Sequence, residues 1–141
     1  MTPQERARRS AQAMWSTDEA SKWFGMKLAD VGEGWARMEL EVAAHHCNGH
    51  LICHGGVIFA LADSAFAFAC NSRNQITVAQ HNSITFLAPG KAGDKLTAEA
   101  REVSLRGRSG VYDVSVSRQN GEIIAIFRGM SRAIRGQLFE E

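Results

Sequence analysis

The stretch from His54 to Asn71 constrains the fold of this chain more than any other part of the sequence. It reads HGGVIFALADSAFAFACN, is dominated by alanine, phenylalanine and leucine, and contains no proline. This composition and length favour a helix over a strand. Because apolar residues lie on nearly every side of such a helix, the rest of the chain must cover most of it. We therefore expect a long central helix over residues 54–71 that is buried by a surrounding layer.

Segments in which apolar and polar residues alternate dominate most of the remaining chain. This period of two indicates antiparallel strands with one face toward the core. The pattern predicts strands over residues 35–42, 76–86, 95–103, 111–118 and 122–132, separated by turns at Pro89-Gly90, Arg106-Gly107 and Asn120-Gly121. The Asn-Gly pair fits a type I′ hairpin turn. The order of one strand, one helix and four strands indicates an α+β fold in which an antiparallel sheet wraps around the helix.

The first 24 residues are expected to form a helical cover over one edge of the sheet. Thr2 and Glu5 have the spacing of a capping box, and proline occupies the first helical position between them. A second start signal lies at residues 16–19, and Gly25 suits a left-handed helix end. No linker, repeat or low-complexity segment interrupts the sequence. We therefore predict one domain over residues 1–141.

Composition excludes several classes of function. The net charge is +1, whereas domains that hold nucleic acid are usually strongly basic. No apolar run of 18 or more residues is present, so no membrane-spanning helix is expected. The first residues lack the apolar segment of a secretory signal. Three cysteines are too few for a disulfide scaffold, which favours a reducing cytoplasm.

Asp63 is the residue that most strongly suggests chemistry. It lies about two turns into the apolar helix. An unpaired carboxylate in such surroundings destabilises the fold, or it is neutralised through a raised pKa. A carboxylate in an apolar cleft is what a nucleophile or general base needs. A structural aspartate that bonds to backbone donors or faces solvent would give the same sequence, so the position alone leaves both interpretations open.

Gly55 and Gly56 open the same helix. The first N–H groups of a helix have no internal partner and carry the positive end of the helix dipole, so they can hold an oxyanion. Glycine also lets a ligand approach the backbone closely. The alternative is a flexible entry into a tightly packed helix. Asn48, in the preceding loop, has turn formation as its default role, and its amide could instead contact a ligand bound at the glycines.

Residues 45–54 contain four histidines and two cysteines, which at first suggests a metal site. The two cysteines are separated by five residues, whereas structural zinc sites use closely paired cysteines, and no second ligand pair follows. We therefore expect no metal. A catalytic zinc held by scattered histidines is the alternative.

The pattern Asn48-Gly49-x4-His54-Gly55-Gly56-x6-Asp63 resembles the hotdog-fold acyl-CoA thioesterases, and more closely their PaaI branch, the thioesterases of phenylacetate degradation. The similarity extends over residues 61–72, 86–90, 110–114 and 127–129, and covers the chain from about residue 24 to residue 136. It implies that two subunits join their sheets edge to edge and share an active site at the interface. A homodimer is then the minimum, and the family suggests a dimer of dimers.

The resemblance also implies roles for individual residues. Gly55 would donate its N–H to the thioester oxygen, and Asp63 from the neighbouring subunit would act as nucleophile or general base. Asn48 would hold the attacking water or the carbonyl, and His54 would shape the loop. Coenzyme A is expected only as part of the substrate and product, with no separate cofactor. It would lie along strand ends and loops that here contain Gly56, Phe86, Pro89, Lys91, Arg106, Arg108, Ser109 and Gly110.

Thioester hydrolysis builds negative charge on the carbonyl oxygen, and a helix N-terminus stabilises that charge. Together with this chemistry, the resemblance implies an acyl-CoA thioesterase that acts on phenylacetyl-CoA or its ring-hydroxylated forms, the latter because residues 80–83 are polar. One alternative is a hotdog acyl-CoA hydratase or dehydratase, in which His54 could move the proton. Another is a non-catalytic acyl-CoA-binding regulator, although no DNA-binding segment is visible.

Overall fold

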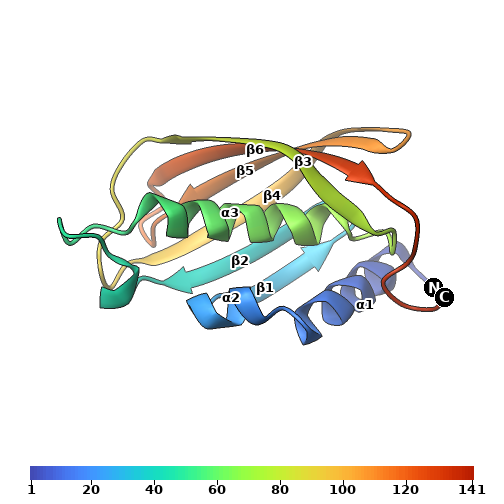
Figure 1. The fold of residues 1–141 in the computed structure, drawn as a ribbon, viewed down its shortest axis with the longest axis horizontal. Coiled ribbons are helices and arrows are strands. Elements are labelled where there is room, and N and C mark those ends of the chain that lie inside the picture. The colour runs from blue at the N-terminus through green and yellow to red at the C-terminus, as the bar shows by residue number, and fades with distance from the viewer.

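A single long helix enclosed by a curved sheet forms the centre of the protein, as the computed structural model of residues 1–141 shows (Figure 1). This helix, α3 (Gly55–Cys70), begins directly after His54 and ends before Asn71. Nine of its residues are buried, and Leu61, Ala62 and Ala65 have no exposed surface. The predicted buried central helix is thus confirmed.

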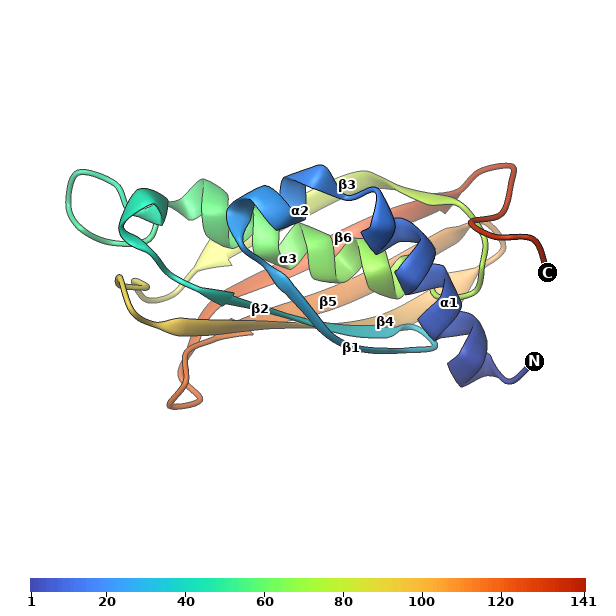
Figure 2. The ribbon, with the colours of Figure 1, turned by 90° about the horizontal axis from the view of Figure 1, so that it is seen from below.

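Six antiparallel strands form one sheet around α3. They are β1 (Lys27–Gly32), β2 (Trp35–Glu41), β3 (Thr77–Phe86), β4 (Lys95–Arg106), β5 (Ser109–Ser117) and β6 (Ile123–Ala133). The order across the sheet is β1-β2-β4-β5-β6-β3, so β3 pairs with β6 at one edge. Figure 2 shows α3 lying between the curved sheet and the N-terminal helices. This is the hotdog arrangement, and the predicted α+β class is confirmed.

Close approach between β6 and α3 requires a glycine. A β-carbon at Gly129 would lie 2.8 Å from the ring of Phe66, which real structures do not tolerate. That ring is buried and packs against Tyr112 and Phe127, with centroid separations of 5.6 and 5.9 Å. Aromatic contacts of this kind stabilise the interior beyond the area they bury. The helix is therefore fixed against the sheet by an aromatic cluster.

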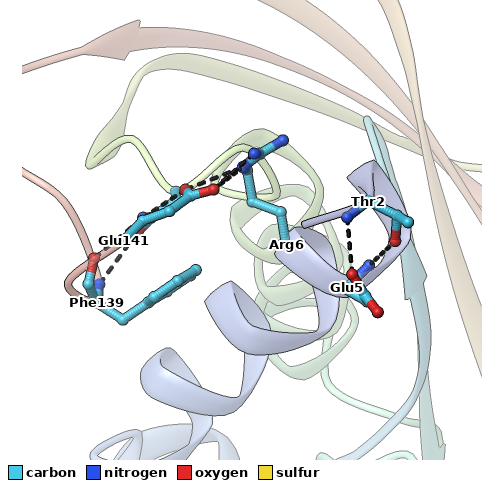
Figure 3. A network of polar contacts seen from close by, with 6 residues as sticks. Thr2, Glu5, Arg6, Phe139 and Glu141 are labelled. Atoms are coloured by element: carbon cyan, nitrogen blue, oxygen red, sulfur yellow. Dashed lines mark hydrogen bonds and ion pairs between the residues drawn. The ribbon is translucent and has the colours of Figure 1, made fainter.

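The predicted N-terminal cover is present as α1 (Pro3–Ser16) and α2 (Glu19–Phe24). Both halves of the capping box form: the Glu5 N–H donates to the Thr2 hydroxyl, and the Thr2 N–H donates to the Glu5 carboxylate (Figure 3). α2 ends at Gly25, which adopts the left-handed conformation with φ +85°. The predicted starts of both helices and the predicted end of α2 are thus confirmed.

One edge of the sheet is covered by a helix, and the other is open. The helix α1 packs beside β1, and the Gln4 side chain donates a hydrogen bond of 2.8 Å to the Val31 carbonyl at that edge. No element covers the outer side of β3, and most of its residues are exposed. One edge is therefore protected, and the other offers unpaired backbone groups.

The C-terminal residues fold back onto α1. The Arg6 guanidinium pairs with the Glu141 carboxylate at 2.6 Å (Figure 3). The Asn74 amide donates to the same carboxylate and to the Phe139 carbonyl. Arg9 stacks over the Phe139 ring. Both termini thus lie at one end of the molecule, away from the N-terminus of α3 (Figure 1). No helix has the length and hydrophobicity needed to cross a bilayer.

The largest differences from the predicted strands are at β1 and at the end of β4, while the other strand ends lie within two residues of the prediction. The strand β1 was not predicted, because a bulge between Leu28 and Asp30 interrupts its alternation. The strand β4 continues to Arg106, three residues past its predicted end. A second bulge, between Glu102 and Ser104, shifts its alternation there. Both differences arise because one extra residue reverses which face the following side chains occupy.

The hairpin at Asn120-Gly121 is where it was predicted, but the type I′ turn is wrong. A type I′ turn needs positive φ at two successive residues, and only Gly121 has it, at +87°. The Gly121 N–H donates to the Arg118 carbonyl, and the Arg118 N–H donates to the Glu122 carbonyl. These bonds close a three-residue loop with a left-handed glycine. Gln119 is held in this loop by hydrogen bonds with Asp94 and Lys95.

Candidate active site

The N-terminus of α3 carries an unused hydrogen-bond donor. His54 caps the helix: its Nδ1 accepts the Gly56 N–H at 2.8 Å, and its carbonyl accepts the Val57 N–H at 2.9 Å. The Gly55 N–H donates no hydrogen bond within the chain. The cap therefore satisfies the neighbouring donors and leaves Gly55 free, at the positive end of the helix dipole.

A groove of about 480 Å³ opens beside this free donor. It is formed by the loop before α3, the first turns of α3 and the segment that follows β3, and its lining comprises Asn48, Ile52, Cys53, Gly55, Ile58, Phe86, Leu87, Ala88 and Pro89. The Phe86 ring lies so close that a β-carbon at Gly55 would be 3.1 Å from it. A mostly apolar cleft with a few polar groups is typical of a small-molecule site. Four predicted site residues, Asn48, Gly55, Phe86 and Pro89, are brought together here.

Asn48 holds its own loop in shape. Its Oδ1 accepts the His50 N–H at 2.9 Å, and its backbone N–H donates to the Ile52 carbonyl at 2.9 Å. This is the side-chain turn that asparagine commonly makes. The Asn48 NH2 group has no partner in the chain, so it is a free donor on a residue that lines the groove.

Asp63 lies half-buried between α3 and β3. The Asn82 amide donates a hydrogen bond of 3.1 Å to the Asp63 Oδ1. Burial raises the pKa of Asp63, and this hydrogen bond partly opposes the rise. No backbone N–H donates to the carboxylate, so the structure does not give Asp63 the backbone partners of a purely structural aspartate. The result is a carboxylate with one free oxygen in apolar surroundings.

Gly55 and Asp63 lie apart within one chain. Asp63 lies eight positions after Gly55 on α3, which corresponds to roughly 12 Å along the helix axis. Asp63 is not among the residues that line the groove. One carbonyl group therefore cannot contact both the Gly55 N–H and the Asp63 carboxylate of the same chain.

The other predicted binding residues fall into two groups at opposite ends of the molecule. Gly56 and Lys91 are exposed near the groove, where Lys91 pairs with Ile52 in an isolated bridge. The turn between β4 and β5 lies at the far end (Figure 1) and contains Arg106, Arg108 and Ser109, followed by Gly110. The twelve residues of β4 run from one end to the other, and their eleven steps span roughly 36 Å. Gly110 is buried, and a β-carbon there would meet the Ser131 hydroxyl at 2.7 Å.

The histidine- and cysteine-rich segment has a structural arrangement. In the short helix η1 (Ala44–His46), the buried His46 accepts the Ala43 N–H at Nδ1, and its Nε2 bonds to the Phe24 carbonyl at 2.7 Å. Both ring nitrogens are therefore occupied. Burial raises the pKa of Cys53 to about 11, so its thiol stays protonated. The fold brings no group of three or more His, Cys, Asp or Glu side chains into an arrangement that could hold a metal ion.

Asn82 is the site residue that sequence reasoning missed. The sequence marked residues 80–83 only as polar, without assigning any of them to Asp63. The only sequence feature that could have indicated Asn82 as a partner of Asp63 was its amide side chain on a strand expected to pack near the helix. Its pairing with Asp63 depends on the register of β3, which the alternation alone does not reveal.

Comparisons with known proteins agree with this fold. The family model described as the thioesterase superfamily matches residues 50–125. The chain is 42% identical over 136 residues to the acyl-coenzyme A thioesterase PaaI of Escherichia coli K12, covering 96% of this chain and 97% of the relative. The solved structure of the E. coli PaaI protein from the phenylacetic acid degradation operon matches with a TM-score of 0.95 at 41% identity, over 96% of this chain and 99% of that one. A Streptococcus mutans UA159 protein bound to acetyl CoA matches with a TM-score of 0.76 at 26% identity, over 79% and 90% of the two chains.

The chain therefore belongs to the thioesterase superfamily, and the predicted resemblance to hotdog thioesterases is confirmed. The match to E. coli PaaI extends over nearly the whole of both chains. Within the superfamily, this protein is a homologue of PaaI.

Proposed function

We propose that this protein is an acyl-CoA thioesterase that hydrolyses phenylacetyl-CoA, or its ring-hydroxylated forms, to the free acid and coenzyme A. The observation that carries the proposal is the free N–H of Gly55 at the start of α3, a residue that lines an apolar groove on a chain that also holds a half-buried Asp63. The names of two relatives support it. One is an acyl-coenzyme A thioesterase, and another is bound to acetyl CoA.

Each group has a chemical task in this reaction. Attack on the thioester carbon places negative charge on the carbonyl oxygen, which the Gly55 N–H and the helix dipole stabilise. Asp63 either attacks the carbon itself or takes a proton from the attacking water. The Asn48 NH2 group holds the water or the carbonyl. The carbon–sulfur bond then breaks. If Asp63 acts as the base, it passes the proton taken from water to the leaving sulfur, and the free acid and the thiol of coenzyme A are formed together. If Asp63 attacks the carbon, coenzyme A leaves as a thiolate that solvent protonates, and water then cleaves the acyl–Asp63 anhydride to release the acid and restore the carboxylate.

The separation of Gly55 from Asp63 supports a site shared by two chains. The open edge of β3 lies next to α3 and can pair with β3 of a second copy. Antiparallel pairing reverses the second helix, so that Asp63 of the partner subunit approaches the Gly55 end of the first. A homodimer is then the minimum active unit, and we propose a dimer of dimers as the complete assembly.

The same pairing gives the two distant groups of binding residues a common ligand. It brings the partner's β4–β5 turn toward the end of the molecule where the groove and Lys91 lie. Lys91, Arg106 and Arg108 form no ion pair within the chain. Unpaired cations at these places suit the phosphates of one coenzyme A molecule.

The chemistry needs only the protein groups and water, so we propose no cofactor other than the coenzyme A of the substrate. The three cysteines are free, which supports the proposed location in the reducing cytoplasm.

The hydratase alternative is disfavoured by the state of His54. Its Nδ1 accepts the Gly56 N–H, so a neutral ring carries its proton on Nε2 and has no free lone pair to take another. Asp63 is the better candidate base. The geometry does not distinguish a thioesterase from a non-catalytic acyl-CoA-binding regulator, and a turnover measurement does.

The test is thiol release from a panel of aryl and aliphatic acyl-CoAs, with kcat/KM determined for each. Arylacetyl-CoA should give the highest value, and Asp63→Asn should abolish turnover while folding and coenzyme A binding are retained. Near wild-type hydrolysis by Asp63→Asn would exclude the mechanism. Hydration of an enoyl-CoA without thiol release would favour the hydratase, and tight acyl-CoA binding without turnover would favour the regulator.

A further inference from the structure

We propose that Asn82 is a positioning residue for Asp63, which holds the carboxylate in the orientation and ionised state that hydrolysis requires. This inference rests on the proposed function. Asn82 lies on β3, and its Nδ2 donates the 3.1 Å hydrogen bond that is the only one the Asp63 carboxylate accepts within the chain. The bond occupies Oδ1 and leaves Oδ2 free for a water molecule or a thioester carbon.

The residue type at position 82 is not explained by packing. Asn82 and Ile84 are less exposed than their immediate neighbours on β3, and Ile84 packs against the hydrophobic core. An apolar residue would therefore suit position 82 as well. Instead, the Asn82 Oδ1 is sealed from solvent and has no hydrogen-bond partner. A buried unpaired carbonyl destabilises a folded chain, so it calls for an explanation other than stability.

The hydrogen bond to Asp63 provides that explanation. A neutral amide donor stabilises the charged form of a carboxylate without adding a charge of its own. Burial acts in the opposite direction, since it raises the pKa of Asp63. Asn82 therefore keeps Asp63 ionised at a lower pH than burial alone would allow, and it fixes the rotation of the carboxylate at the same time.

Few other ionisable groups act on Asp63. On α3, the thiol of Cys70 lies two turns further on, and its pKa is raised mainly by burial and slightly by the Asp63 charge. From α2, Ser21 contacts the Ser64 hydroxyl at 3.1 Å and bonds to the Asp18 carboxylate. On β3, His81 alternates with Asn82 and lies on the opposite face. Asn82 is the one side chain that hydrogen-bonds to the carboxylate within the chain.

The test compares Asn82→Leu with the wild-type enzyme. Leucine has a similar size and no donor. We expect kcat to fall by about tenfold to a hundredfold, as for other small displacements of catalytic groups, with KM little changed. The acid limb of the kcat–pH profile should move upward by about one pH unit. Thermal stability should be equal or higher, because the unpaired carbonyl is removed.

Thr85→Val is the matched control, since Thr85 lies on the outward face of the same strand and is exposed. It should leave kcat and the pH profile unchanged. A carboxyl NMR titration of Asp63 in the wild type and in Asn82→Leu measures the same shift without depending on turnover.

An Asn82→Leu enzyme with the wild-type profile and an unmoved Asp63 titration would overturn the inference. So would a loss of activity that only follows a loss of folded protein. These outcomes are distinct from failure of the proposed function, which would appear as no thiol release by the wild type or as full activity of Asp63→Asn. If the wild type releases no thiol, the proposed function is wrong, and the proposed role of Asn82 in catalysis is wrong as well.

Discussion

Two inactive variants of this chain should restore activity when they share a dimer. The first is Gly55→Pro, which removes the N–H that faces the groove. Proline is tolerated at the first position of a helix, and His54, with φ −58° and ψ 134°, already has the conformation favoured before proline. The second is Asp63→Asn. Gly55→Ala is the control, because it keeps the N–H and introduces the same β-carbon against Phe86 at 3.1 Å.

The expected magnitudes follow from the separation of the two groups on α3. Loss of one oxyanion donor costs on the order of 10²–10³ in rate, so Gly55→Pro should fall that far below Gly55→Ala. In a mixed dimer, one site combines an intact Gly55 with an intact Asp63, and the other site lacks both. Equal amounts and random pairing give about half mixed dimers, so about a quarter of all sites are intact. The mixture should therefore reach about a quarter of the wild-type rate.

The assay is thiol release after the two variants are unfolded together and refolded at a series of ratios. If the fraction of one variant is x, activity should follow x(1 − x) and peak at equal amounts. A site contained within one chain would leave every site defective at every ratio. Mixed dimers demonstrated by mass measurement, with no more activity than the separate variants, would refute the shared site.

Three further predictions concern stability. Asp63→Asn should raise the melting temperature at neutral pH, because burial raises the pKa of Asp63 in the folded protein. Below the ordinary pKa of 3.8, Asp63 is protonated in both the folded and the unfolded chain, so the variant should gain no stability at such pH values. The gain should grow as pH rises from 3.8 through the higher pKa of the folded state. Gly129→Ala should cost about 1–3 kcal/mol in urea unfolding, because the new methyl group overlaps the buried Phe66 ring. Asp94→Asn should lower stability at neutral pH, because hydrogen bonds from Arg118 hold the pKa of Asp94 at about 2; the difference from wild type should vanish as pH falls from 3.8 to about 2 in thermal melts.

Much of the fold could be predicted because the decisive signals are local. The composition of the central helix, the capping residues of α1 and α2 and the alternation in five strands are each readable within a short window. The strand β1 and the end of β4 were not, because bulges break the alternation. The turn at Asn120-Gly121 also depends on a contact distant in sequence, the hydrogen bond from Gln119 to Asp94.

The site divides in the same way. That Gly55 and Asn48 lie close together could be predicted, because both belong to one short motif. The structure places both at one groove. The pairing of Asn82 with Asp63 could not, because β3 contains a bulge between Ala79 and His81. Without that extra residue, the odd-numbered side chains that begin with Thr77 would continue to face α3. The bulge turns the even-numbered ones inward instead, and so selects Asn82.

The open edge of β3 also governs how the chain must fold. None of its ten residues is proline or an acidic or basic residue other than His81, so it lacks the usual features that block unwanted strand pairing. Until it pairs with a second copy, a newly folded protomer exposes the unpaired backbone N–H and C=O groups of β3. Correct pairing is a second-order event, and it competes with the addition of misfolded chains to the same edge. Refolding yield should therefore pass through a maximum as protein concentration rises, with the solitary protomer as the species most exposed to aggregation.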